Sequence, residues 1–127
     1  MHRGKILLID DKVEFLKVLS ERLKLRGYQV AAVGSGGEAL KAVEREPFDV
    51  IVLDLVMPVM DGVETLRRLR KLDPRSQIIV FSGYATSQEV DQAMALGAND
   101  FLAKPADLDS LLERINRAIA RKMGPEA

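Results

Sequence analysis

The sequence predicts an α/β fold in which a parallel sheet is wound by helices on both faces. Along its 127 residues, five apolar runs of strand length alternate with five segments whose apolar residues recur at helical spacing. The run at 50–53 is wholly apolar. That pattern is typical of a strand buried on both faces, because a half-buried strand would alternate polar and apolar side chains. Alternation of strands and helices implies right-handed crossovers between parallel strands. The expected strands are 5–9, 29–33, 50–53, 77–81 and 101–102.

Boundary signals support each predicted helix. The first covers 12–26 and stops at Gly27, because glycine commonly follows a helix C-terminus. The second begins at Ser35, in a Ser-x-x-Glu capping box, and ends before Pro47. Cap residues also begin the last three helices: Asp61, Thr86 and Asp107. The helix after Thr86 is expected to bury three side chains: Val90, Ala93 and Met94.

Composition limits the class of protein. Lysine plus arginine and aspartate plus glutamate both number 19, so the formal net charge is zero and no basic field is available to hold nucleic acid. There is no cysteine, no signal-peptide pattern and no apolar run long enough to cross a bilayer. We therefore expect a cytoplasmic protein with no direct contact with nucleic acid or membrane. Residues 1–122 are expected to form one domain, with 123–127 as a tail or the start of a linker.

Several strands end in polar residues that can share one site. Asp10 and Asp11 follow the first strand, and Asp54 follows the third. In the flavodoxin-like strand order 2-1-3-4-5, strands one and three are neighbours, and ligands bind at the carboxyl ends of the strands. The three carboxylates then converge, and Ser82 and Lys104 end the next two strands. We predict this (βα)5 order and a functional site at that edge of the sheet.

Clustered carboxylates imply a cation, because two unit charges about 4 Å apart repel by roughly 4 kcal/mol at an effective dielectric constant of about 20. A site with oxygen ligands alone suits Mg²⁺. Lys104 adds a positive charge and Ser82 a hydroxyl, which together form a clamp for a phosphoryl group. Asp54 is ionised near neutral pH, so it is the group able to attack phosphorus and become an aspartyl phosphate.

The chain resembles the receiver domain of bacterial two-component response regulators from residue 5 to about residue 122. Each matching piece is weak alone, but the ordered set at these spacings is specific. The pieces are Asp10-Asp11, Asp54 with Met57-Pro58 and Asp61-Gly62, Ser82-Gly83, Ala98-Asn99-Asp100-Phe101 and Lys104-Pro105.

The resemblance implies that Asp54 accepts a phosphoryl group from a sensor histidine kinase or a histidine phosphotransfer protein. Asp11, Asp54 and the backbone carbonyl of Val56 would bind Mg²⁺ directly, and Asp10 would act through a metal-bound water. Lys104 would contact the phosphoryl oxygens. Such a domain catalyses only its own phosphorylation and dephosphorylation, so we do not expect an enzyme with an external substrate.

The resemblance also implies a conformational switch. Ser82 and Phe101 would move together, the hydroxyl toward the phosphoryl group and the ring inward, and the Lys104–Pro105 peptide bond would be cis. The surface of the fourth helix, fifth strand and fifth helix would then be read by a downstream effector domain or protein. A homodimer could form there through charged residues of the two helices: Arg114, Arg117, Arg121, Glu89 and Asp91.

Residues near the acceptor also bear on the lifetime of the phosphoryl group. Val56 and Tyr84 flank the path that a hydrolytic water would take, and neither carries a carboxamide or carboxylate to orient it. We therefore expect slow self-dephosphorylation.

Three alternative functions follow from the same residues. An aspartyl-phosphate phosphohydrolase would use a second Asp where Val56 stands. A flavodoxin-like cofactor module would need Ser, Thr or Gly donors after Ile9, which are absent there. A degenerate receiver that binds proteins without phosphorylation stays open. The sequence also leaves open whether the domain stands alone or precedes an effector.

Overall fold

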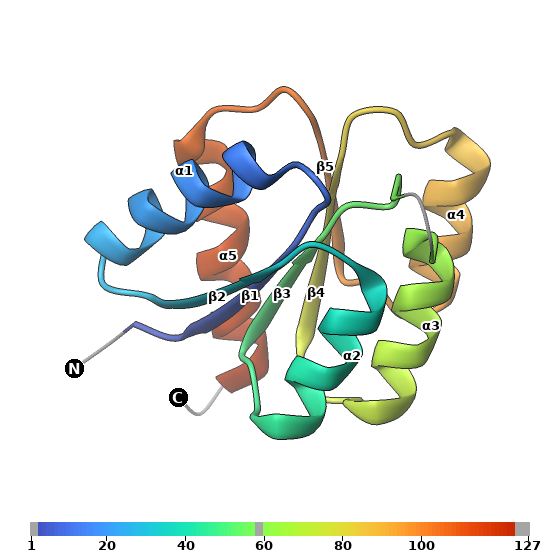
Figure 1. The fold of residues 1–127 in the computed structure, drawn as a ribbon, viewed down its shortest axis with the longest axis horizontal. Helices are drawn as coiled ribbons and strands as arrows, with labels where there is room; N and C mark the ends of the chain where they lie inside the picture. Colours follow the sequence, from blue (N-terminus) through green and yellow to red (C-terminus); the bar gives the residue numbers. More distant parts are fainter. Residues whose placement is uncertain (1–2, 58–59, 124–127) are drawn as a thin grey trace.

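The computed structural model describes residues 3–57 and 60–123, which form a single parallel sheet covered by helices (Figure 1). The strand order is β2-β1-β3-β4-β5, and every neighbouring pair is parallel. The predicted fold class and strand order are therefore confirmed. The strands are β1 Lys5–Ile9, β2 Gln29–Val33, β3 Val50–Leu53, β4 Gln77–Ser82 and β5 Asp100–Ala103.

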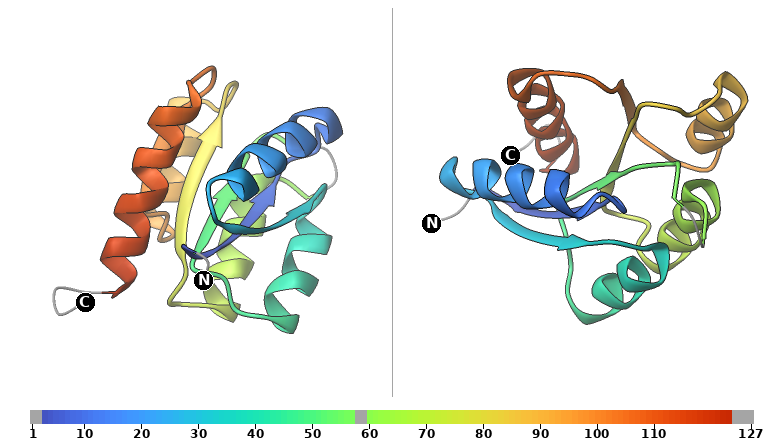
Figure 2. Two further views of the ribbon diagram at one scale, coloured as in Figure 1. Left: turned by 90° about the vertical axis from the view of Figure 1, so that its left-hand side faces the viewer. Right: turned by 45° about the horizontal axis from the view of Figure 1, so that its top comes forward.

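Helices cover both faces of the sheet, α1 and α5 on one side and the other three on the opposite side (Figure 2). Their bounds are α1 Val13–Leu25, α2 Gly36–Arg45, α3 Gly62–Leu72, α4 Ser87–Ala95 and α5 Leu108–Met123. Among the described residues, none of these helices has the length and apolar character needed to span a membrane.

The central strands β1 and β3 alternate their side chains between two separate cores. Ile51 and Leu53 pack beneath α2, α3 and α4, whereas Val50 and Val52 pack beneath α1 and α5. All four are at most 4% exposed. Because both faces of β3 are buried, its sequence shows an unbroken apolar run rather than alternation.

Four helices begin with the side-chain caps that the sequence predicts. Each cap accepts a backbone N–H from the first turn of its own helix: Ser35, Asp61, Thr86 and Asp107. The capping box is complete at Thr86, where the Glu89 carboxylate also accepts the Thr86 N–H. At Ser35 the box is incomplete, because the hydroxyl itself donates to the Glu38 carboxylate.

The inner face of α4 is narrower than predicted. Ala93 is fully buried and Val90 is half-buried, but Met94 is 42% exposed. The prediction that Met94 is buried was wrong. A nine-residue helix beside the edge strand β5 has little sheet surface to cover, so a small residue fills the contact and the longer neighbour turns outward.

Arg70 of α3 ties together three segments at the amino end of the sheet. Its guanidinium donates to the carbonyls of Ser76 and Gly97, both at 2.7 Å, and to Asn99 Oδ1 at 3.1 Å. The Asn99 side chain in turn accepts the Ile78 N–H of β4 at 2.8 Å. Burial lowers the pKa of Arg70, because it disfavours the charged guanidinium. The acceptors around the guanidinium offset this cost of desolvation.

Replacing Arg70 with Met should therefore lower the free energy of unfolding by about 2–3 kcal/mol, because three partly buried acceptors lose a charged donor. Urea denaturation measures the change. Arg75→Met is the matched control, since Arg75 is exposed and the change of charge is the same. Equal stability losses in the two variants would contradict this role for Arg70.

Candidate functional site

Three aspartates meet at the carboxyl ends of β1 and β3, as the strand order predicts. Carboxylate oxygens of Asp10, Asp11 and Asp54 all lie within 4.8 Å of one another. Asp10 and Asp54 are only 3% and 4% exposed, whereas Asp11 is open to solvent. These oxygen ligands form an acidic cluster that could bind a metal ion.

Lys104, at the end of β5, partly neutralises this cluster. Its Nζ lies 2.5 Å from Asp10 Oδ2 and 3.6 Å from Asp54 Oδ2. The ammonium group also lies 4.4 Å from the ring centroid of Phe15 and 5.3 Å from that of Phe81. Aromatic faces attract a cation in this geometry. The protein thus supplies one of the positive charges that the clustered carboxylates require.

The Asp54 carboxylate is held in a fixed orientation. The Ser82 hydroxyl donates to Asp54 Oδ1 at 2.6 Å, and the backbone N–H of Val56 donates to the same oxygen at 3.0 Å. Oδ2 is the oxygen nearer Lys104. One oxygen therefore has two donors, while the other is placed beside a cation.

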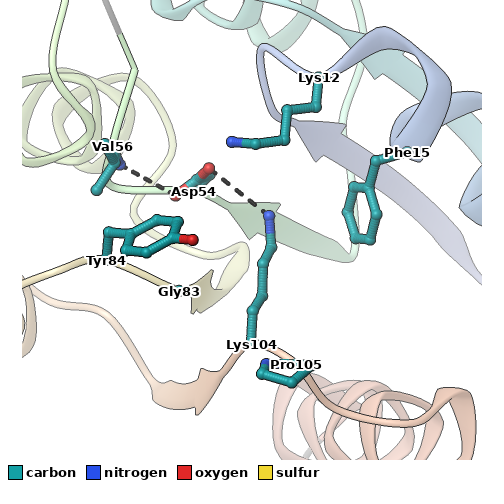
Figure 3. A pocket seen from close by; sticks show the side chains of 8 residues that line it. All are labelled: Lys12, Phe15, Asp54, Val56, Gly83, Tyr84, Lys104 and Pro105. Carbon is teal, nitrogen blue, oxygen red and sulfur yellow. Dashed lines mark hydrogen bonds and ion pairs between the residues drawn. The ribbon is translucent and has the colours of Figure 1, made fainter.

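An open cavity of about 380 Å³ gives access to Asp54 (Figure 3). Val56 and Tyr84, which are 40% and 83% exposed, flank the carboxylate. The residues lining the cavity are Lys12, Phe15, Asp54, Val56, Gly83, Tyr84, Lys104 and Pro105.

Two of these lining residues were missed by the sequence reasoning. Phe15 and Lys12 both fall within the predicted helix 12–26, and that prediction does not place either of them at the site. A sequence signal for Lys12 existed, because it directly follows the acidic pair Asp10-Asp11 in the same loop.

The remaining predicted residues lie around β5. The Lys104–Pro105 peptide bond is cis, the conformation that the resemblance implies. Phe101 is half-buried against the core beneath α4, and it lines a shallow pocket with Ala85 and Val90. Phe101 of β5 pairs in register with Val80 of β4, two residues before Ser82 on the same strand.

A cluster of carboxylates at the carboxyl ends of parallel strands, with a half-buried lysine beside it, defines this chain as a doubly wound α/β domain whose site is centred on Asp54. The family model for the response regulator receiver domain matches residues 6–116, and the chain belongs to that family. It is a receiver domain of the two-component response regulators.

Solved structures of similar proteins agree in fold. The CheY-like receiver domain protein from Methanospirillum hungatei is 30% identical, with a TM-score of 0.91 over 94% of this chain and 95% of that one. A response regulator from Burkholderia pseudomallei, solved with a phosphorylated aspartic acid and a calcium ion, is 34% identical, with a TM-score of 0.84. That match covers 97% of this chain and 72% of the other.

Curated relatives are longer proteins. The transcriptional regulatory protein ZraR of Salmonella typhimurium is 37% identical over 130 residues, which is 99% of this chain but 30% of that protein. KdpE of Mycobacterium tuberculosis is 38% identical over 116 residues, which is 91% of this chain and 51% of that protein. The chain therefore spans between about a third and a half of the length of these relatives.

The start of α3 packs so closely behind the loop that follows β3 that a side chain is excluded there. A Cβ added to Gly62 would lie 2.2 Å from Leu55 Cα and 2.6 Å from the Asp54 carbonyl oxygen. Both contacts are with backbone, so the loop carrying Asp54 and Val56 would have to move.

Gly62→Ala should lower the free energy of unfolding by about 3 kcal/mol through overpacking. Gly37→Ala is the control, because Gly37 also lies in the first turn of a helix but a Cβ there meets no atom within 4 Å. That control should be neutral or stabilising by about 0.5–1 kcal/mol. Chemical denaturation compares the two, and a tolerated Gly62→Ala would contradict the close approach.

Proposed function

We propose that this domain is a phosphorylation-driven switch in which Asp54 accepts a phosphoryl group from a sensor histidine kinase or a histidine phosphotransfer protein. The observation that carries the proposal is the convergence of Lys104, Ser82 and two further aspartates on the Asp54 carboxylate. The domain modifies only itself in this reaction and turns over no external substrate.

The transfer is a substitution at phosphorus. An Asp54 oxygen attacks, a phosphorus–oxygen bond forms, and the bond from phosphorus to the donor breaks with its electron pair leaving on the donor. Three donors already lie against the carboxylate: Lys104 Nζ, the Ser82 hydroxyl and the Val56 N–H. In the proposed reaction each of them would donate to a phosphoryl oxygen, so the charge that develops would meet groups that are already oriented.

We propose Mg²⁺ as the metal of the acidic cluster, which when bound would neutralise phosphoryl oxygens. Asp11, Asp54 and the Val56 carbonyl are the proposed direct ligands. Asp10 is proposed to act through a water molecule. Two contacts support that outer role, because Asp10 already accepts from Lys104 Nζ and from the Lys12 N–H.

The proposed read-out runs from Ser82 to Phe101 and the α4-β5-α5 surface. In this structure the Ser82 hydroxyl is already directed at Asp54, so the motion left for phosphorylation to drive lies mainly at Phe101. Phosphorylation can shift only an equilibrium whose two states bind the new oxygens differently. Phe101 is half-buried and lines a pocket, so its ring has space for the second packing state that the proposed switch requires.

A homodimer through this surface would have to replace contacts within the chain. Arg114 pairs with Asp100 at 2.6 Å, and Arg117 pairs with Glu113 at 2.5 Å. Arg121 donates to the Gln77 side chain at 2.9 Å. Exchange of exposed pairs such as Arg117–Glu113 costs little.

We further propose that residues 1–122 form the receiver, that 123–127 are a tail or the start of a linker, and that the domain works in the cytoplasm. Residues 124–127 lie outside the described part of the chain. The effector is either attached beyond them or a separate protein. The length of ZraR and KdpE supports an attached effector.

Incubation with acetyl phosphate and Mg²⁺ should add one phosphoryl group to the intact mass of the wild type. Asp54→Asn should show no adduct, because the nucleophile is lost, and chelation of Mg²⁺ should abolish the adduct. Asp61→Asn, a change of the same type at an exposed helix cap, is the control and should still be labelled. If the wild type gained no adduct, a receiver that binds proteins without phosphorylation would become the better account.

The phosphorylated protein should lose its label slowly, because neither Val56 nor Tyr84, which line the cavity beside Asp54, carries a carboxamide or carboxylate to orient a water molecule there. Val56→Asn should shorten the half-life at least several-fold by adding a carboxamide to the cavity. Val56→Ala enlarges the cavity without adding a polar group, so it distinguishes the orientation of the hydrolytic water from its access to Asp54. Mass spectrometry at successive times follows the decay. Wild-type decay within seconds at neutral pH would contradict the expectation.

A further inference from the structure

Lys12 occupies a position that helix energetics disfavour. It is the N-cap of α1, with φ −90° and ψ 97°, and its side chain makes no cap hydrogen bond. Asn, Asp, Ser and Thr are preferred there because their oxygens accept a free N–H of the first turn. A cation is also repelled by the positive end of the helix dipole. A residue that breaks local rules without a local gain points to a function elsewhere.

The side chain of Lys12 extends into the cavity over the phosphoacceptor. Lys12 lines that cavity together with Asp54, and its amine is directed toward the Asp54 carboxylate (Figure 3). Its Nζ lies 3.8 Å from Asp11 Oδ1. The Lys12 N–H donates to Asp10 Oδ1 at 3.0 Å, which anchors the residue at the site.

The two lysines of the site differ in their surroundings. Lys104 is 18% exposed, bonded to Asp10 and enclosed by the rings of Phe15 and Phe81. Lys12 is 58% exposed and makes only a long contact with a solvent-exposed carboxylate. Lys104 is therefore already paired within the protein, and the charge of Lys12 is the more accessible of the two to an arriving ligand.

Lys12 also changes the charge that an arriving ligand meets. Three carboxylates and two ammonium groups leave one negative charge at the site. A bound divalent cation would reverse that sign and leave one positive charge. With a neutral residue in place of Lys12, the same cation would leave the site uncharged, and a doubly negative phosphoryl group would lose this attraction.

We propose that Lys12 is a donor-binding residue that draws anionic phosphodonors into the cavity and competes with the metal ion for Asp11. The inference rests on the proposed phosphoryl transfer to Asp54 and adds a residue to that site. Lys12 approaches Asp54 from a different side of the carboxylate than Lys104 does (Figure 3). The two ammonium groups can therefore contact different oxygens of one phosphoryl group.

Lys12→Gln tests the proposal, with Lys17→Gln as the matched control on the exposed face of α1. The rate of labelling by acetyl phosphate is measured at low and high salt, and Mg²⁺ affinity is measured by calorimetry in the absence of donor. Lys12→Gln should slow labelling by about threefold or more at low salt, with a smaller difference at high salt, because exposed charges are screened. It should also bind Mg²⁺ more tightly, because Asp11 loses a competing cation.

Identical behaviour of Lys12→Gln and Lys17→Gln in labelling and in Mg²⁺ affinity would overturn the inference. The Mg²⁺ affinity distinguishes a failure of the proposed phosphoryl transfer from a failure of the proposed role of Lys12. A wild type that binds Mg²⁺ but takes no phosphoryl group would refute the proposed function, and an unchanged affinity in Lys12→Gln would then refute the role of Lys12 as well.

Lys12→Asn distinguishes a functional role of Lys12 from a structural one, because it should change stability and labelling in opposite directions. Asparagine is a good N-cap, so this variant should raise the urea midpoint while slowing labelling. Stability and labelling that fell together would instead assign Lys12 to the fold and overturn the inference.

Discussion

The ion pair between Lys104 and Asp10 is the contact on which the site depends. Two carboxylates are buried to more than nine-tenths, and buried charge is unfavourable unless something offsets it. Lys104 offsets Asp10 directly and Asp54 at 3.6 Å. Because Lys104 follows β5 and Asp10 follows β1, the pair closes the site across the two strands that lie between them. Removing one partner would leave a buried charge uncompensated, so the contact supports both the fold and the chemistry.

The sheet itself sets the positions of these groups. The N–H of Asp10 donates to Val33, that of Asp54 to Ile9 and that of Lys104 to Ser82, at 3.0–3.2 Å. Each of these three residues is thus the first one beyond its own strand, and its N–H still bonds to the neighbouring strand. The site is held by extensions of the β-ladder rather than by free loops. This explains how short side chains from separate segments can be kept within hydrogen-bond distance of one another.

Much of this arrangement could be predicted from sequence because it follows from periodicity and from where strands end. The strand order brings Asp10 and Asp54 together, and the helix caps are local signals. The direction in which side chains point was harder to predict from the sequence. Met94 satisfies the helical spacing yet lies outside the core, because the width of the sheet beneath α4 decides which residues are covered. The place of Phe15 beside Lys104 depends on how the first turn of α1 approaches Phe81 of β4, which no local pattern specifies.

At the start of α1, the residue that would best stabilise the helix differs from the residue that is present. The other four helices begin with side chains that accept a first-turn N–H, so capping is the general solution in this sequence. Helix α1 departs from it at the point where the chain leaves the acidic pair. An uncapped N-terminus with a lysine sacrifices local helix stability, and the same lysine reduces repulsion among the carboxylates beside it. A bound cation would perform that second task as well, so the proposed competition between the lysine and a metal ion for Asp11 follows from the same electrostatics.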